Sequence, residues 1–239
     1  MFGAYQAGAW KALAQSFRPD IVVGVSAGAL NAWAIAGGCT PAELCDSWTR
    51  RDSADVMHLH FPWVPWNGIF DPAPLYRRVD EYYARYRPRV PFAINIVEVP
   101  RFRQIYVTGD RIGPEHLRAT CAIPFGYPPV CIDGKYYVDG GLVETVPLGA
   151  AVELGATSAV VINVLKFMPS IVLRTSVGAF RALTAPKMTF PNLQVTTICP
   201  SEPLGRLRDT AHWTEENVRR WIGLGERDAA NVLCVKPSR

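Results

Sequence analysis

Residues 20–33 read Asp-Ile-Val-Val-Gly-Val-Ser-Ala-Gly-Ala-Leu-Asn-Ala-Trp, and this stretch decides the fold. A short β-branched run, a Gly-x-Ser-x-Gly pentapeptide and an Ala-rich segment follow one another, which predicts a strand, a sharp turn and a helix. Gly24 and Gly28 carry no Cβ, so the strand and the helix can pack closely while Ser26 adopts a strained backbone conformation. The hydroxyl of Ser26 would then point outward at the amino end of the helix.

The amino end of that helix favours negative charge, because its first amides have no acceptor within the helix. The amide of Ala27 is placed to donate to an oxyanion that forms when Ser26 attacks a carbonyl carbon. A membrane span is the other interpretation of this uncharged stretch. Its glycines, Ser26 and Asn31 interrupt the apolar run, so we favour a serine nucleophile.

The composition is typical of one globular domain. The chain has 239 residues, 49% of them hydrophobic, and no linker-like segment divides it, so a single domain over 1–239 is the simplest interpretation. A net charge of +4 does not predict nucleic-acid binding, although it is compatible with an anionic surface. The cysteines contain no Cys-x-x-Cys pair and the first residues no signal-peptide pattern, which favours reduced thiols in a cytoplasmic protein.

Hydrophobic periodicity and turn residues predict the remaining elements. Thr40, Pro41 and Glu43 have the spacing of a capping box. Helices that alternate with apolar strands predict an α/β three-layer sandwich with a largely parallel central sheet. Helices are expected over 4–16, 41–51, 114–120, 148–154 and 215–233 and from residue 72 onward, and strands over 92–99, 103–108, 158–165 and 193–198, with another strand ending at Asp139.

A serine nucleophile needs a base, and the sequence offers two candidates. His212 would serve an α/β-hydrolase triad, in which histidine follows serine and aspartate, but too few residues precede Ser26 for the strands that come before the elbow in that fold. Asp139 ends a predicted strand before Gly140 and Gly141, and these glycines would let its carboxylate take the Ser26 proton directly. Asp-Gly-Gly is also a common turn sequence, so the residues alone leave both interpretations open.

Taken together, these motifs resemble the patatin-like phospholipases. The serine elbow at 24–28, an Ala-x-x-Ala-x-Pro block within 119–129 and Asp-Gly-Gly at Asp139 occur in the order of that family's signature blocks. Residues 3–8 are similar to the start of the family's first helix, and 215–233 to its last helix. The resemblance therefore covers nearly the whole chain.

The resemblance implies a lipid acyl hydrolase whose substrate is a lipid or another fatty-acyl ester. Ser26 would be the nucleophile, Asp139 the base within a loop that includes Gly140 and Gly141, and an acyl-enzyme the intermediate. The family needs neither metal nor cofactor. The sequence agrees, because it has no Asp-x-Asp-x-Asp-Gly loop and no His/Cys pair with metal-ligand spacing.

One motif departs from the family pattern. Of the glycine-rich oxyanion motif, this sequence retains Gly3, with Phe2 at the basic position. We therefore assign the oxyanion site to Gly3 and Ala27, and expect the chain to be a shortened form of a longer active protein, because a strand should feed the helix at 4–16. The alternatives are a catalytically impaired patatin-fold lipid-binding module and a short-chain esterase or thioesterase.

Two segments suggest contact with lipid. The aromatic loop at 61–70 contains tryptophans, which prefer membrane interfaces, and arginines recur at 77, 78, 85, 87 and 89. Weak peripheral contact with an anionic membrane surface is the functional interpretation. The alternative is that the aromatics pack over the core and the arginines form a solvated face.

Overall fold

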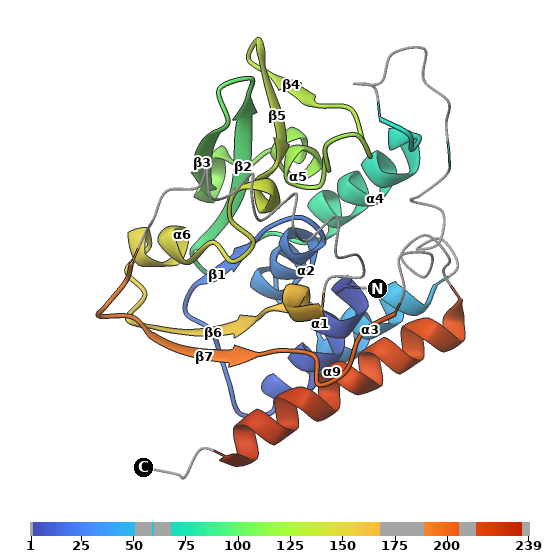
Figure 1. The fold of residues 1–239 in the computed structure, drawn as a ribbon, viewed down its shortest axis with the longest axis vertical. Helices are drawn as coiled ribbons and strands as arrows, with labels where there is room; N and C mark the ends of the chain where they lie inside the picture. The colour runs from blue at the N-terminus through green and yellow to red at the C-terminus, as the bar shows by residue number, and fades with distance from the viewer. Residues whose placement is uncertain (1, 51–58, 60–67, 168–188, 206–213, 236–239) are drawn as a thin grey trace.

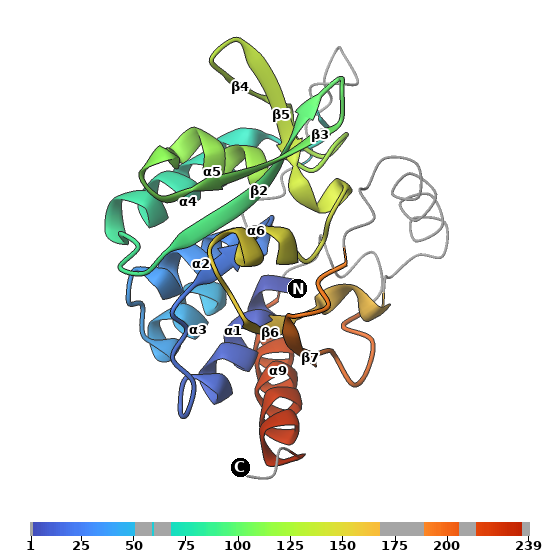
Figure 2. The ribbon, with the colours of Figure 1, turned by 90° about the vertical axis from the view of Figure 1, so that its left-hand side faces the viewer.

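A five-stranded sheet with helices on both faces forms the centre of the molecule (Figures 1 and 2). The computed structural model describes residues 2–50, 59, 68–167, 189–205 and 214–235. This arrangement confirms the α/β sandwich. The sheet contains β1 (Val22–Gly24), β2 (Phe92–Val99), β3 (Arg103–Thr108), β4 (Val130–Ile132) and β5 (Lys135–Asp139).

Strand β2 organises the sheet, because it pairs with three other strands. Ala93 pairs with both β1 and β3, and Ile96 pairs with both β3 and β5. A strand has two edges, so β1 and β5 must share the edge opposite β3. On that shared edge, β1 runs parallel to β2 and β5 runs antiparallel to it. The carboxyl ends of β1 and β5 therefore approach each other beside Asn95.

The sheet is mixed rather than largely parallel, which corrects the expected pairing. The β2–β3, β2–β5 and β4–β5 pairs are antiparallel. The physical reason lies in the connections: a parallel pair needs a crossover of a dozen or more residues, whereas 100–102 and 133–134 make tight hairpins. Strand β4 follows a turn-rich, proline-containing segment and was not predicted. Outside this sheet, β6 (Ser158–Ile162) and β7 (Gln194–Ile198) form a separate parallel pair.

The helices follow the predicted periodicity closely. Helix α3 begins with the predicted capping box, in which the Glu43 amide donates to Thr40 Oγ1 at 3.2 Å and the Thr40 amide to Glu43 Oε2 at 2.9 Å. None of the described helices has the length and apolar character that crossing a bilayer requires. The described helices are α1 (Phe2–Leu13), α2 (Ala27–Ala36), α3 (Pro41–Thr49), α4 (Pro72–Arg85), α5 (Pro114–Thr120), α6 (Leu148–Glu153) and α9 (Glu215–Val235).

Helix α9 packs along α1, at the side of the molecule where β6 and β7 lie (Figure 1). Two glycines allow this close contact: a Cβ on Gly8 would lie 1.9 Å from the Ile222 carbonyl oxygen, and one on Gly225 2.0 Å from the Tyr5 carbonyl oxygen. The buried Tyr5 hydroxyl also donates to the Asp228 carboxylate at 2.9 Å. The two helices thus pack backbone against backbone and are joined by a buried hydrogen bond.

Candidate active site

Ser26 occupies a strained turn between β1 and α2. Its φ of 57° and ψ of −140° fall where residues with a side chain are rare, at a cost of about 1–3 kcal/mol. Its side chain makes no capping hydrogen bond to α2. A Cβ on Gly24 would lie 2.6 Å from Ala29 Cα, and one on Gly28 3.1 Å from Gln6 Nε2. Gly24 is therefore needed for the packing that holds this turn, whereas a side chain at Gly28 would have to displace the Gln6 amide group.

Asp139 is buried at the end of β5, with 5% of its surface exposed. Its amide donates to the Ala122 carbonyl at 2.9 Å, which ties the end of the strand to the loop after α5. Its Oδ1 accepts a hydrogen bond from the Gly141 amide at 2.7 Å. A backbone amide of the loop that follows Asp139 therefore orients its carboxylate.

The shared edge of β2 brings the elbow and the carboxylate together. Gly24 lies opposite Ile94 and Asp139 opposite Ile96, so the two positions are about 7 Å apart along the strand. Ser26 follows Gly24 by two residues. The structure thus places the predicted nucleophile and the predicted base at one junction of the sheet.

The two glycines after Asp139 allow its loop to fold over this junction. A Cβ on Gly140 would lie 2.3 Å from the Asn95 carbonyl oxygen. One on Gly141 would lie 3.0 Å from Asp139 Oδ1 and 3.8 Å from Val25 Cγ2. Gly141 therefore sits between the carboxylate and the residue that precedes Ser26, where a larger residue would push the two apart.

A buried polar chain connects the elbow to this loop, and sequence analysis did not assign it. The Ser26 amide donates to Thr120 Oγ1 at 3.0 Å, and that hydroxyl donates to the Asn95 carbonyl at 2.8 Å. Asn95 Nδ2 in turn donates to the carbonyls of Gly140 and Glu144, at 3.1 and 3.2 Å. Thr120 and Asn95 are both fully buried. The available sequence signal was one asparagine within the apolar strand 92–97.

The two predicted oxyanion residues have different surroundings. Ala27 is the first residue of α2, so its amide has no acceptor within the helix. Gly3 lies within α1, where a Cβ would be 2.2 Å from the Trp48 ring, and its carbonyl accepts a hydrogen bond from Asn31 Nδ2 at 2.9 Å. Among the hydrogen bonds of the described residues, none joins Gly3 to Ser26.

Two titratable groups close to the junction have raised pKa values. Burial, and next the Asp139 carboxylate, raise the pKa of the Cys121 thiol. Burial and the hydrogen bond to Glu144 at 2.6 Å likewise raise the pKa of Tyr106.

His116 is the histidine that the structure describes, and it has a structural role at the start of a helix. His116 accepts a hydrogen bond from the Gly113 amide at 3.1 Å and so caps α5. His58, His60 and His212 lie outside the described residues. In the described ranges, no three His, Cys, Asp or Glu side chains lie close enough to hold a metal ion.

Comparisons with known proteins agree with this architecture. The family model described as patatin-like phospholipase matches residues 1–152. The crystal structure of VipD from Legionella pneumophila is similar, with a TM-score of 0.51 and 10% sequence identity, over 97% of this chain and 64% of that chain. At this identity the similarity shows the fold alone, and the chain spans less than two thirds of VipD. The search of curated proteins found no match. Because the family model matches well over half of its length, the chain belongs to the patatin-like phospholipase family.

Proposed function

We propose that this chain is a serine acyl hydrolase that cleaves fatty-acyl esters of lipids with Ser26 as nucleophile and Asp139 as base. The observation that carries the proposal is the shared edge of β2, along which the strained elbow and the buried carboxylate converge from opposite directions. Family membership supports lipid as the substrate class. We assign the activity to one domain over residues 1–239.

The proposed reaction has two halves. The Asp139 carboxylate takes the proton of Ser26 Oγ while Oγ bonds to the ester carbonyl carbon, and the Ala27 amide donates to the resulting oxyanion. The leaving alcohol takes the proton as the ester C–O bond breaks, and the acyl group remains on Ser26. Asp139 then takes a proton from a water whose oxygen bonds to the acyl carbonyl carbon, and gives that proton to Ser26 Oγ as the Oγ–C bond breaks and the fatty acid leaves.

Hydrolysis of a chromogenic fatty-acyl ester by Ser26→Ala, Asp139→Asn and the double variant tests this proposal. Each single change should lower kcat by about two to four decades, and the double variant should lose little more, because the two residues act as one unit. Asp133→Asn is the matched control, since this exposed aspartate lies in the hairpin that leads to Asp139. Circular dichroism should show that all variants are folded.

The measurement also decides between the alternatives. If Asp139→Asn kept more than about a tenth of the parent activity, the assignment of the base would be wrong. A collapse of turnover in His212→Ala would assign the base to histidine instead. Retention of lipid without turnover by the parent chain would support the binding-module interpretation.

We also propose weak contact with an anionic lipid surface. The chain offers two basic regions for it. In the first, Arg77, Arg87 and Arg89 are exposed, although Arg87 also stacks on the Tyr83 ring. Arg78 stacks on the rings of Trp48 and Tyr82. Trp63 and Trp66, which were expected near the membrane interface, lie outside the described residues.

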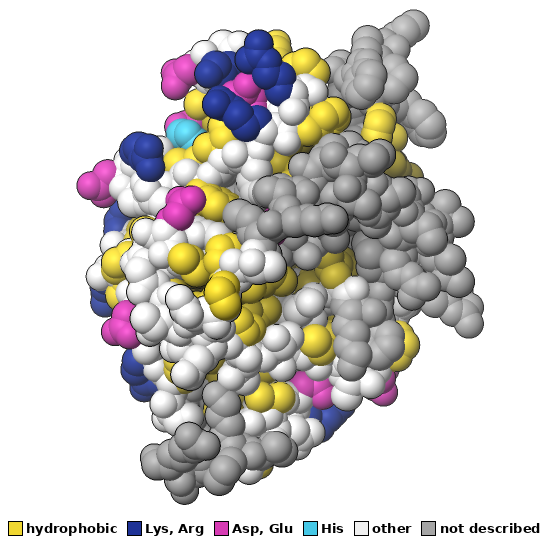
Figure 3. All heavy atoms as spheres, turned by 60° about the vertical axis from the view of Figure 1, so that its left-hand side comes forward, with side chains coloured by type: hydrophobic (Ala, Val, Ile, Leu, Met, Phe, Trp, Pro, Cys, Tyr) yellow, Lys and Arg dark blue, Asp and Glu magenta, His cyan; other side chains and the backbone are white. Residues whose placement is uncertain are grey.

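The second region lies at the end of the molecule drawn uppermost in Figure 3, where basic side chains gather around an acidic one. There the hairpin turns bring Arg101, Arg103 and Lys135 within 4 Å of Glu98. Vesicle sedimentation should show graded, salt-sensitive binding that weakens with Arg77→Gln and Arg87→Gln. Weakening with Arg101→Gln and Lys135→Gln instead would move the contact to the second region.

A further inference from the structure

An exposed apolar surface lies beside the proposed active site. Among the described residues, Leu59, Ile69, Ile123 and Phe125 are large apolar residues that are between 48% and 73% exposed. The Ile69 amide donates to the Phe125 carbonyl at 3.0 Å, and Leu59 forms an isolated β-bridge with Phe70. Ile123 lies in the same turn as Phe125. These backbone contacts bring the four exposed residues together, and we call them the apolar patch.

The loop after α5 connects the apolar patch to the catalytic junction. Thr120, the last residue of α5, accepts a hydrogen bond from the Ser26 amide at 3.0 Å. Two residues later, the Ala122 carbonyl accepts one from the Asp139 amide at 2.9 Å. Ile123 is the next residue, so its Cα lies about 3.8 Å from that of Ala122. The patch therefore begins one residue beyond the contact that holds Asp139.

The turn that carries the patch is fixed and strained. The amides of Gly126 and Tyr127 both donate to the Ile123 carbonyl at 2.9 Å, and Phe125 has a φ of 63°, which is rare for an aromatic residue. A Cβ on Gly68 would lie 2.6 Å from the Gly126 carbonyl oxygen, so the neighbouring segment packs tightly on this turn. Backbone strain and exposed apolar side chains both cost free energy, and together they are typical of binding surfaces.

We propose that the apolar patch receives the acyl chain of the substrate ester and makes the enzyme selective for long acyl chains over short ones. An uncharged chain suits this surface, because residues 119–132 contain no charged side chain. A longer chain covers more of the patch and so removes more apolar area from water. The inference rests on the proposed acyl hydrolase function and adds the selectivity for chain length to it.

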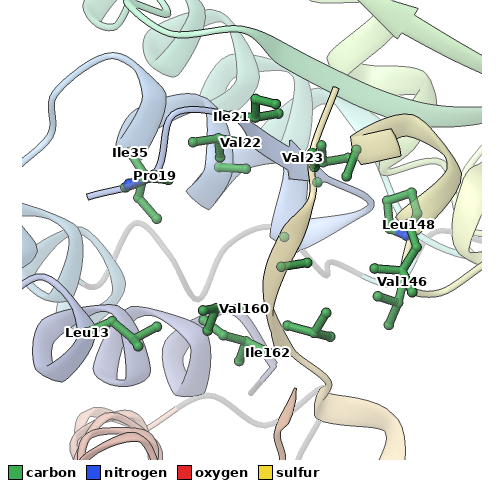
Figure 4. A pocket seen from close by; sticks show the side chains of 18 of the residues that line it. Leu13, Pro19, Ile21, Val22, Val23, Ile35, Val146, Leu148, Val160 and Ile162 are labelled. Atoms are coloured by element: carbon green, nitrogen blue, oxygen red, sulfur yellow. The ribbon is translucent and has the colours of Figure 1, made fainter. Parts of the chain in front are cut away.

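A second apolar space lies behind the elbow. It is a cavity of about 370 Å³ between β1 and β6, which we call the slot. Figure 4 shows Val23 of β1 and Val160 of β6 on two sides of it. Neither Ser26 nor Asp139 is among the described residues that line the slot. The patch is therefore connected to both proposed catalytic residues more directly than the slot is.

Hydrolysis of soluble chromogenic esters from butyrate to decanoate tests the selectivity. The kcat/KM of the parent chain should rise by at least about tenfold over this series, because each methylene half removed from water favours the longer ester by about twofold. In the double variant Ile69→Ser and Ile123→Ser, the ratio of decanoate to butyrate should fall below about threefold. Val152→Ser is the matched control, since this exposed valine lies on α6, and it should keep the parent ratio.

A second measurement locates the acyl chain without turnover. Stearic acid with a nitroxide near its methyl end is added to Ser26→Ala below the concentration at which the acid forms micelles. It should broaden the amide NMR signals of Ile69 and Ile123 more than those of Val23 and Val161, which line the slot. Selective broadening at the patch in a parent chain that cleaves no ester would support acyl binding there and refute only the hydrolase proposal.

Three results would overturn the inference. Stronger broadening at Val23 and Val161 would place the acyl chain in the slot. An unchanged ratio of decanoate to butyrate in the double variant would show that the patch does not set chain length. Broadening at Ile69 and Ile123 by spin-labelled phosphatidylcholine vesicles, but not by the free acid, would identify the patch as a surface for a bilayer.

Discussion

The two edges of strand β1 face different environments. Along the edge that faces β2, the backbone is paired up to Gly24, and the Ser26 amide beyond it is bound by Thr120. Along the edge that faces β6 lies an apolar slot with no described strand in it. The hydrogen bond that fixes the Ser26 amide thus comes from the paired side, whereas Gly24 and Gly28 also line the slot. Substitutions on the paired side therefore test the proposed chemistry most directly.

The largest expected effect comes from crowding the paired side. In Gly140→Ala the new Cβ would meet the Asn95 carbonyl 2.3 Å away, so the loop after Asp139 must shift. We expect ester hydrolysis to fall by at least about a hundredfold, because displacing a catalytic group by about 1 Å has effects of this size. Gly134→Ala is the control: its Cβ would meet nothing within 4 Å, although φ is 74°. Gly140 has no positive φ, so its loss would come from the contact, whereas an equal loss in Gly134→Ala would show that a methyl group without that contact is enough to lower the rate.

Removing one hydrogen bond of the polar chain should have the next largest effect. Thr120→Val retains the shape of the side chain but leaves the Ser26 amide and the Asn95 carbonyl without their partner. We expect kcat to fall by about ten- to a hundredfold with KM nearly unchanged, while Thr120→Ser retains most of the rate. A loss confined to KM, or no rescue by serine, would mean that Thr120 does not position the elbow.

Replacing a valine by threonine on each side of β1 compares how dry the two sides are, because a buried hydroxyl without a partner lowers stability. Val97 of β2 is 0% exposed, whereas Val161 of β6 is half-buried and lines the slot. Val97→Thr should lower the free energy of unfolding by about 1–3 kcal/mol, and Val161→Thr by less than about 1 kcal/mol, since its hydroxyl can reach water. Urea denaturation measures both. Equal costs would show that the slot is as dry as the core.

The smallest expected effect is the pH dependence of the stability that Glu98 of β2 contributes. The hydrogen bond from Arg103 and the neighbouring charges lower the pKa of the buried Glu98 carboxyl from its ordinary 4.5. A lowered pKa in the folded state stabilises the fold above pH 4.5, and the contribution is lost as the pH falls further. The urea midpoints of Glu98→Gln and the parent should therefore differ at pH 7 and converge in acid. A difference independent of pH would assign the effect to packing.

The sequence by itself determined the local features of this protein. The β-branched run and the two glycines around Ser26 specify the strand, strained turn and helix because their chemistry acts on adjacent residues. The capping box at Thr40 and the periodicity of 215–233 are equally local, and α3 and α9 occur where they were predicted. The catalytic pair Ser26 and Asp139 remains a prediction.

The tertiary structure alone decided how distant segments meet. No local pattern indicates that β1 and β5 share an edge of β2, because pairing depends on contacts between residues far apart in the sequence. That pairing buries Asn95 and Thr120 between the elbow and the loop after Asp139. There the two side chains form hydrogen bonds with backbone groups of both segments. The tertiary structure also decides that β1 and β6 lie on two sides of one cavity. The sequence of a strand does not tell which of its edges will pair, because pairing depends on the strands that come to lie beside it.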